Sequence, residues 1–286
     1  MGILFAFGAL FSWGIGDFLI QRSVRKFGNG VVLFTITTFG ALVLAPFALP
    51  DLGSVFTNRN NLLLLLTTSV ILLFAAIFDF QALKVGKISV IEPVFAMEIP
   101  LAATLAAVFL REFPSGPQLL SILVAFLGIF LVSLKSLRHL RQIRPERGVL
   151  LALLATLGMG IINFLFGLAG RETSPIMINW FTDVFLALAT GIYLLSTGEY
   201  KKLLPDWRAN KKLILGVSVL DKAAWLTYTY SMLYIPIAIA TTVSESYIAL
   251  GAILGLWLNR EKLKPHQFAG IALAVLGAVA LAAVTS

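Results

Sequence analysis

The sequence predicts an all-α integral membrane protein in which ten transmembrane helices form two inverted five-helix repeats. Three observations predict this fold class: the composition, a series of long apolar runs and an internal repeat. Of the 286 residues, 59% are hydrophobic and 13% are charged, whereas soluble domains contain about 25% charged residues. A soluble fold has no interior that could bury so much apolar surface.

Ten apolar runs are each long enough to cross a membrane as a helix. A helix rises about 1.5 Å per residue, so about 20 apolar residues cover a hydrocarbon core about 30 Å thick. The runs cover residues 2–20, 30–50, 61–80, 88–110, 117–135, 148–170, 175–197, 211–231, 236–258 and 265–284. The short connectors leave no room for a soluble domain, so we expect a multi-pass protein of the cell membrane.

Basic residues concentrate in alternate connectors. The odd-numbered connectors, between residues 22 and 264, hold 18 Lys and Arg residues together, whereas the even-numbered ones hold only Arg59, Arg111 and Arg171. Cationic loops stay in the cytoplasm, so this count predicts cytoplasmic odd connectors and both termini outside. Because the net charge of +8 comes from these connectors, we expect no nucleic-acid partner. The basic segment before residue 148 is expected to act as a linker that stays in the cytoplasm, and contact with anionic membrane lipids is the alternative interpretation.

The chain aligns with itself at two offsets. An offset of 149 matches residues 88–128 to 237–277 with 13 identities in 41 positions. The polar matches in this alignment are Arg111 with Arg260, Glu112 with Glu261 and Gln118 with Gln267. An offset of 146 matches residues 2–19 to 148–165, including Gly14 with Gly160. The two halves therefore begin and end alike.

The repeat predicts three segments: a first five-helix repeat at 1–137, a basic linker at 138–147 and a second five-helix repeat at 148–286. Five is an odd number of spans, so the second half must enter the membrane in the opposite orientation to the first. Inverted repeats are typical of transporters, because two similar halves can exchange their conformations and so open a central path to either side.

The chain resembles the drug/metabolite transporter superfamily, in particular the ten-helix EamA type, over nearly its whole length. The resemblance rests on Trp13 and Gly14 in the segment FSWGIGDF, on the segment EPVF at 92–95, and on Arg111 and Glu112. It implies an exporter or uptake system for amino acids, other metabolites or drugs, with a central cavity lined by the first four helices of each half. It also implies cytoplasmic termini, so the orientation stays open between this arrangement and the charge count.

Two glutamates lie deep in matching spans. Glu98 is near the middle of span four, two residues before Pro100, and Glu245 lies in the polar segment TTVSES of span nine, where the repeat places it close to Glu98 in depth. Charges at this depth cost several kcal/mol, so they mark functional sites by default. Two such carboxylates can bind an ammonium group or share a proton. Hydrogen bonding between helices is the alternative interpretation.

Span eight carries a second polar group. Asp221 and Lys222 lie about ten residues inside it, or roughly 15 Å from the connector. Asp221, Trp225 and Tyr228 share a face at helical spacing and predict the wall of a pocket. Lys222 is expected either to anchor a substrate carboxylate or to pair with a buried acid that holds two helices together.

Further candidates lie on other spans. Asp17 and its repeat counterpart Asn163 follow kinks expected at Gly14 and Gly160, and they are expected to line the path or to bond helices together. Trp13 precedes Asp17 by one turn of helix, and Trp180 lies one turn before Asp183 in span seven.

Small residues at helical spacing predict close packing of spans five and ten, either with each other or with a second protomer. These residues are Ser121, Ala125, Gly128, Gly270, Ala274 and Gly277.

Enzymatic activity is not expected. The sequence contains no HExxH, GxSxG or P-loop motif. It contains no cysteine, and His139 and His266 lie in connectors, so we expect no metal and no cofactor. We expect a secondary transporter that exports small polar metabolites, such as amino acids or related amines, by alternating access, with protons as a further partner and a homodimer left open. The alternatives are a translocator of lipid-linked sugars or phospholipids and, last, an intramembrane enzyme.

Overall fold

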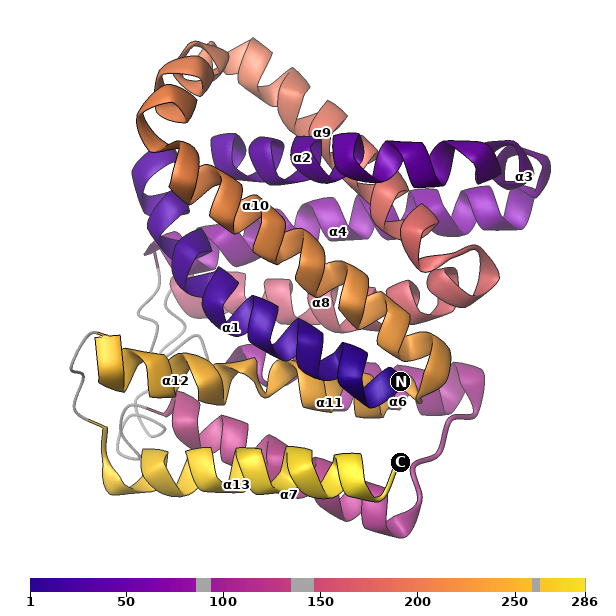
Figure 1. Cartoon of the computed structure of the whole chain (residues 1–286), viewed down its shortest axis with the longest axis vertical. Coiled ribbons are helices and arrows are strands. Elements are labelled where there is room, and N and C mark those ends of the chain that lie inside the picture. The colour runs from indigo at the N-terminus through magenta and orange to yellow at the C-terminus, as the bar shows by residue number, and fades with distance from the viewer. Residues whose placement is uncertain (86–93, 135–146, 259–262, 286) are drawn as a thin grey trace.

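A computed structural model describes residues 1–85, 94–134, 147–258 and 263–285 (Figure 1). Every regular element in these ranges is a helix. The α-helices are α1 (Gly2–Phe27), α2 (Asn29–Ala48), α3 (Leu52–Thr57), α4 (Arg59–Val85), α6 (Glu98–Leu110), α7 (Gly116–Ser133), α8 (Arg147–Glu172), α9 (Pro175–Thr197), α10 (Leu203–Tyr234), α11 (Ile237–Glu245), α12 (Tyr247–Leu258) and α13 (Pro265–Ala283). Short 3-10 helices cover Leu49–Asp51 and Glu199–Lys202.

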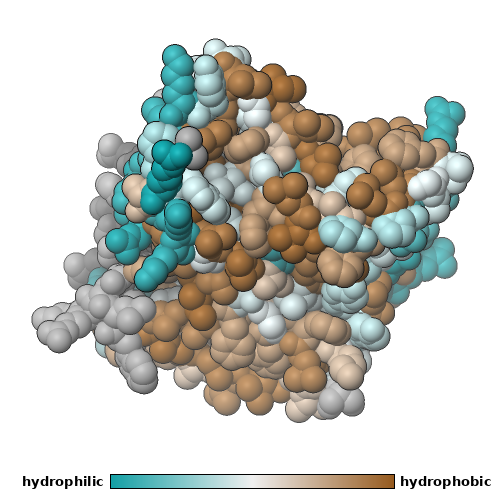
Figure 2. Space-filling view, turned by 45° about the horizontal axis from the view of Figure 1, so that its top comes forward, coloured by the Kyte–Doolittle hydropathy of each residue, from teal (hydrophilic) through white to brown (hydrophobic). Residues whose placement is uncertain are grey.

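The predicted membrane fold is confirmed. Seven of the described helices are long and apolar enough to cross a membrane, and two shorter apolar helices cover Glu98–Leu110 and Ile237–Gly251. Helix α10 has 32 residues, but it carries Asp221 and Lys222 in its middle, and it bends at Asn210, just before the predicted span. Figure 2 shows apolar side chains over the middle of the visible face and hydrophilic ones gathered at its ends. The count of ten spans stays a prediction, because residues 86–93 lie outside the described ranges.

The helices of the two halves pair in a reciprocal way. Helix α1 packs along α10, and α8, the counterpart of α1, packs along α4, the counterpart of α10. Helix α2 packs along its own counterpart α9, and α7 along its counterpart α13 (Figure 1). Contacts between the halves therefore occur twice, as expected for two repeats related by an axis in the membrane plane.

Two glycines show that the register of the repeat is also preserved. A Cβ atom at position 14 would lie 2.6 Å from Leu250, and one at position 160 would lie 2.6 Å from Leu101. The sequence offsets pair Gly14 with Gly160 and Leu101 with Leu250. Helices α1 and α8 continue without interruption through these glycines. The glycines allow another helix to approach closely.

Helices α7 and α13 form the closest contact between the halves. A Cβ atom at Gly128 would meet the backbone of Ala274, and a Cβ atom at Gly277 would meet the backbone of Ala125. The small residues of spans five and ten therefore pack against each other within one chain. This seam joins the last helix of each half.

Arg171 ties several segments together at the end of the molecule where the even-numbered connectors lie. Its guanidinium forms an ion pair with Glu112 at 2.5 Å, and its Nε donates to the Met232 carbonyl at 2.8 Å. The second carboxylate oxygen of Glu112 accepts a hydrogen bond from the backbone N–H of Ile237 at 2.8 Å. Arg111, just before Glu112, has a left-handed backbone with φ of 56°, which is uncommon for a residue with a side chain. The connector between α6 and α7 is thus held against α8 and the start of α11.

We expect Gly277→Ala to lower thermal stability, because its methyl group would lie 2.5 Å from the Ala125 nitrogen and the helices would have to separate. Such overpacking costs about 1–3 kcal/mol. Gly251→Ala in α12 is the matched control, since no atom lies within 4 Å of its Cβ position. Unfolding midpoints measured in detergent compare the two variants, and equal midpoints would contradict the close seam.

We expect Arg171→Lys to lower stability by about 1.5–3 kcal/mol, the usual contribution of hydrogen bonds to charged groups. Lysine keeps the charge but cannot bond a carboxylate and a carbonyl in the planar geometry of a guanidinium. Arg59→Lys, at an exposed helix start, is the control. The idea fails if both variants unfold at the temperature of the unchanged protein.

Candidate functional site

Two broken helices meet at the centre of the protein. Spans four and nine were each predicted as one continuous helix, but the structure interrupts both. Helix α6 begins at Glu98, after a turn at Ala96 and Met97, and α11 ends at Glu245, where Ser246 separates it from α12. Pro100 contributes to the first interruption, because it has no N–H to donate to the Ala96 carbonyl. Helices α6 and α11 pack against each other.

Each break carries one of the two predicted glutamates. Glu98 accepts a hydrogen bond from the Asn163 side chain of α8 at 3.4 Å, and Asn163 is buried. Glu245 is also buried. Tyr228 of α10 forms a 2.7 Å hydrogen bond with the Thr241 hydroxyl of α11. Thr241 lies one turn before Glu245, so Tyr228 connects α10 to α11 close to the second break.

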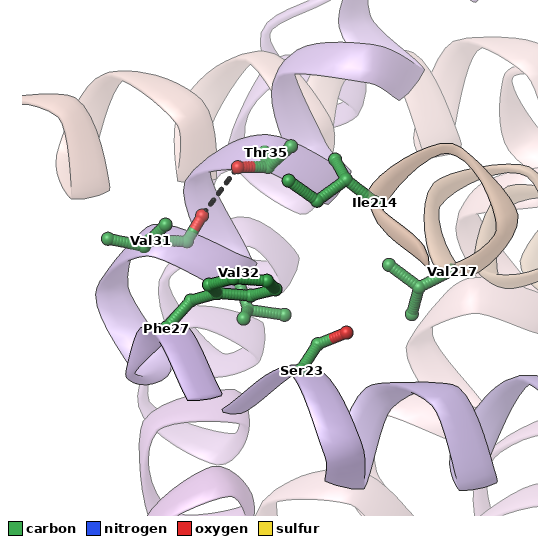
Figure 3. A pocket seen from close by; sticks show the side chains of 7 residues that line it. All are labelled: Ser23, Phe27, Val31, Val32, Thr35, Ile214 and Val217. Atoms are coloured by element: carbon green, nitrogen blue, oxygen red, sulfur yellow. Dashed lines mark hydrogen bonds between the residues drawn. The ribbon is translucent and has the colours of Figure 1, made fainter. Parts of the chain in front are cut away.

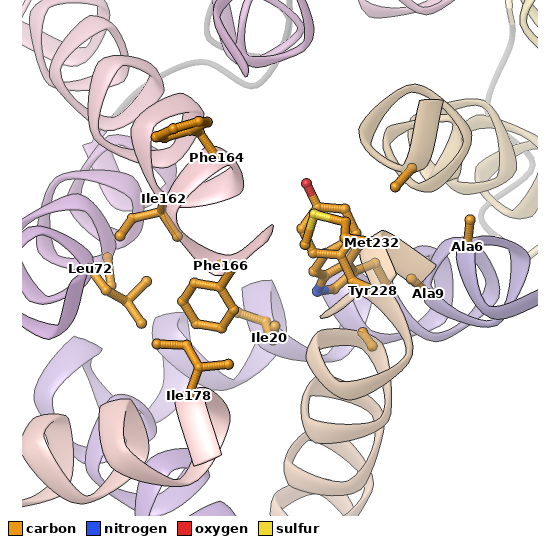
Figure 4. Close-up of a cluster of buried hydrophobic side chains, with 14 of the residues drawn as sticks. Ala6, Ala9, Ile20, Leu72, Ile162, Phe164, Phe166, Ile178, Tyr228 and Met232 are labelled. Atoms are coloured by element: carbon orange, nitrogen blue, oxygen red, sulfur yellow. The ribbon is translucent and has the colours of Figure 1, made fainter. Parts of the chain in front are cut away.

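Aromatic rings cluster around Tyr228 and Trp225 of α10. The ring centroid of Trp13 lies 5.4 Å from that of Trp225, 5.2 Å from that of Tyr228 and 6.1 Å from that of Tyr247. Phe166 lies 4.6 Å from Trp225. Figure 4 shows Phe166 on α8 and Tyr228 on α10, on facing sides of the interior. The rings of this aromatic cluster thus come from α1, α8, α10 and α12.

Phe166 and Tyr247 were not among the predicted site residues. Phe166 lies in an apolar run, where nothing in the sequence separates an inward-facing ring from one facing lipid. Tyr247 had a usable signal, because the offset of 149 pairs it with Glu98. The second repeat therefore has an aromatic ring where the first has a carboxylate.

Lys222 forms an ion pair with a buried acid, which is one of the two roles predicted for it. Its ammonium lies 2.5 Å from a carboxylate oxygen of Asp183 on α9, and both side chains are almost fully buried. Trp180, one turn before Asp183, donates its indole N–H to the Ala41 carbonyl of α2 at 3.0 Å. Asp221 is half-buried on α10. Trp180, Asp183 and Lys222 thus join α2, α9 and α10.

Other predicted positions have a smaller place in the described structure. Asp17 lies in α1, but its side chain is outside the described part of the chain, and so is the segment that contains His139. His266 bonds to the Leu134 carbonyl through Nε2 at 2.7 Å, which connects α13 with the end of α7. Among the described residues, no three His, Cys, Asp or Glu side chains form a group that could hold a metal ion.

A small cavity lies between α1, α2 and α10 (Figure 3). Its volume is about 10 Å³, the lower limit for one water molecule. Its polar lining includes the buried hydroxyl of Ser23 and that of Thr35, which donates to the Val31 carbonyl at 2.6 Å. The cavity is too small for a metabolite, so the candidate site remains the region of the helix breaks.

The fold and the paired breaks define a helical membrane protein of the transporter class. The sequence profile described as the EamA-like transporter family matches residues 1–134 and again residues 146–283. The chain therefore belongs to the EamA-like transporter family, and it is a membrane transporter of the drug/metabolite type, as the sequence resemblance implied.

Two further similarities support the repeat and the fold. An uncharacterized protein of Methanocaldococcus jannaschii is 22% identical over 125 residues, which are 43% of this chain and 90% of the relative. That relative is therefore about one repeat long. A solved crystal structure is similar over 99% of this chain and 98% of its own, with a TM-score of 0.73 and 14% sequence identity. At this identity, the similarity shows a shared fold alone.

Proposed function

We propose that the protein is a secondary transporter that exports small polar metabolites with an amino group, such as amino acids or related amines, across the cell membrane. One observation carries the proposal: Glu98 and Glu245 lie at the breaks of two helices, α6 and α11, that pack against each other. Transporters often bind their substrates near mid-membrane, at discontinuous helices of inverted repeats.

The chemistry of this site favours a cationic group attached to an organic body. The buried carboxylate of Glu245 and the partly buried one of Glu98 are costly, because each charge has lost some or all of its water. An ammonium group between them would offset that cost with charge-assisted hydrogen bonds. The faces of Trp13 and Trp225 can cover the rest of the substrate and attract its positive charge.

The reciprocal packing of the repeats supports alternating access. If the two halves exchange their conformations, the contacts of α1 with α10 and of α8 with α4 exchange as well, and the site opens to the other side. The substrate would stay at the breaks while the surrounding helices rearrange. We place the substrate between Glu98, Asn163, Glu245 and the aromatic cluster.

Counterflow in liposomes tests the proposal directly, because exchange of labelled for unlabelled substrate needs no coupling ion. The probes are labelled leucine, lysine, putrescine and tetraphenylphosphonium. We expect saturable exchange of at least one of them, reduced about tenfold to a hundredfold in both Glu98→Gln and Glu245→Gln. This range corresponds to losing a charge-assisted hydrogen bond of about 1.5–3 kcal/mol.

Glu199→Gln is the matched control, since Glu199 pairs with Lys202 near the surface and its loss should leave exchange unchanged. Thermal unfolding of each variant separates a lost site from a lost fold. Full exchange in both glutamine variants would contradict the site. If none of the probes exchanges in the unchanged protein, the amine substrate class is wrong, and lipid-linked sugars become the substrates to test.

A further inference from the structure

The ion pair of Asp183 and Lys222 is far from water along its helices. Asp183 is eight residues from the start of α9, and Lys222 is twelve residues from the end of α10. Their side chains are 7% and 8% exposed, and the charged atoms lie 2.5 Å apart. Ionisable residues at this depth are rare and usually belong to ion paths or proton relays.

Helix α2 packs directly against this ion pair. A Cβ atom at Gly40 would overlap both the carboxylate of Asp183 and the stem of Lys222, so glycine is needed for α2 to lie against the pair. Helix α2 contains no ionisable residue. The pair is therefore enclosed by three helices, with an uncharged backbone on one side.

A third charged residue makes the group unbalanced. Asp221 directly precedes Lys222 on α10 and is half-buried there, while Lys222 pairs with Asp183. The three residues therefore hold two carboxylates and one ammonium, which leaves one negative charge in excess when all three groups are ionised. Excess charge in a membrane interior is costly. Binding one proton would neutralise the group.

Other acidic residues occur on helices packed against α9 or α10. They are Asp79 of α4, Glu172 of α8, Glu199 of the 3-10 helix, Glu245 of α11 and Asp17 of α1, whose side chain is outside the described part of the chain. The pair of Asp183 and Lys222 lies between α9 and α10 against Gly40 of α2, whereas Glu98 and Glu245 lie at the breaks of α6 and α11. Asp183, Lys222 and Asp221 therefore form a group at a different place from the carboxylates at the helix breaks.

The corresponding helices of the first repeat lack a group like that of Asp183, Asp221 and Lys222. Helix α4, the counterpart of α10, has no charged residue between Arg59 and Asp79, and α2, the counterpart of α9, has none at all. The fold can therefore form these helix contacts with uncharged residues alone. A buried ion pair is often no more stabilising than well-packed apolar side chains, so folding gives no reason for the charges.

We infer that Asp183, Asp221 and Lys222 form a binding site for one proton, separate from the substrate carboxylates, and that this proton drives the movement of substrate. The inference rests on the proposed transport function. When the proton binds, an O–H bond forms on one of the two aspartates, and the ammonium of Lys222 pairs with the other. The charge of the group changes from −1 to 0. The same proton leaves to water on the opposite side when the protein changes conformation.

Two measurements on the same proteoliposomes test this inference. Counterflow reports exchange without a driving force, and accumulation under an imposed pH gradient reports coupling. The probe is whichever of labelled leucine, lysine, putrescine or tetraphenylphosphonium exchanges fastest. In the unchanged protein we expect a pH gradient of the correct direction to drive accumulation. An unchanged protein that exchanges the probe but ignores both directions of the gradient overturns the inference and leaves the transport function standing.

Two variants remove the proton site in different ways. Asp221→Asn removes the excess carboxylate and leaves the ion pair in place. The double variant Asp183→Leu with Lys222→Met replaces the pair with apolar side chains, a change that buried pairs often tolerate. For both, we expect counterflow within about twofold of the unchanged protein and no gradient-driven accumulation. Accumulation as high as that of the unchanged protein in either variant overturns the inference.

Asp206→Asn, near the start of α10 and outside the predicted span, is the control and should keep both activities. Because Asp221→Asn retains the ion pair, it tests the inference even if the double variant does not fold. Absence of counterflow in the unchanged protein would instead count against the proposed transport function. The two failures are therefore distinguishable.

Discussion

In the hydrocarbon core of a membrane, every backbone N–H and carbonyl group must find its partner within the protein, because no water is present to replace it. Most spans meet this constraint as unbroken helices. The two breaks meet it through local turns: Met97 donates its N–H to the Val94 carbonyl at 3.0 Å, and Ser246 donates its N–H to the Val243 carbonyl at 3.2 Å. Such interruptions are tolerated only where they are enclosed by protein or line a cavity. Ser246 at the second break is buried, whereas Met97 at the first break is 46% exposed.

Much of the fold could be predicted from the sequence, because the length and apolarity of a span depend on its own residues. The self-alignment of the sequence also predicted the register of the repeat, and the contacts of Gly14 with Leu250 and of Gly160 with Leu101 agree with it. Glu98 and Glu245 could be placed at similar depth for the same reason. The partner of Lys222 could not be chosen, since it depends on how α9 and α10 are rotated against each other, which no periodicity in either helix specifies.

The two halves share a fold but differ in chemistry. The second half carries the group of Asp183, Asp221 and Lys222, whereas the first half has apolar residues on the corresponding helices. At the breaks, Tyr247 takes the repeat position of Glu98, and Ala96 takes that of Glu245. Helix packing restrains the backbone equally in both halves, but it leaves the residues that face the interior free to diverge.

The seam between α7 and α13 is self-complementary. Gly128 meets Ala274 and Gly277 meets Ala125, and the repeat pairs each member of the first contact with a member of the second. This reciprocity is the property of an interface between two identical subunits. Two copies of a chain one repeat long, inserted in opposite directions, could associate through the same contacts. Gene duplication and fusion would then have joined subunits that were already in contact, without requiring a new interface.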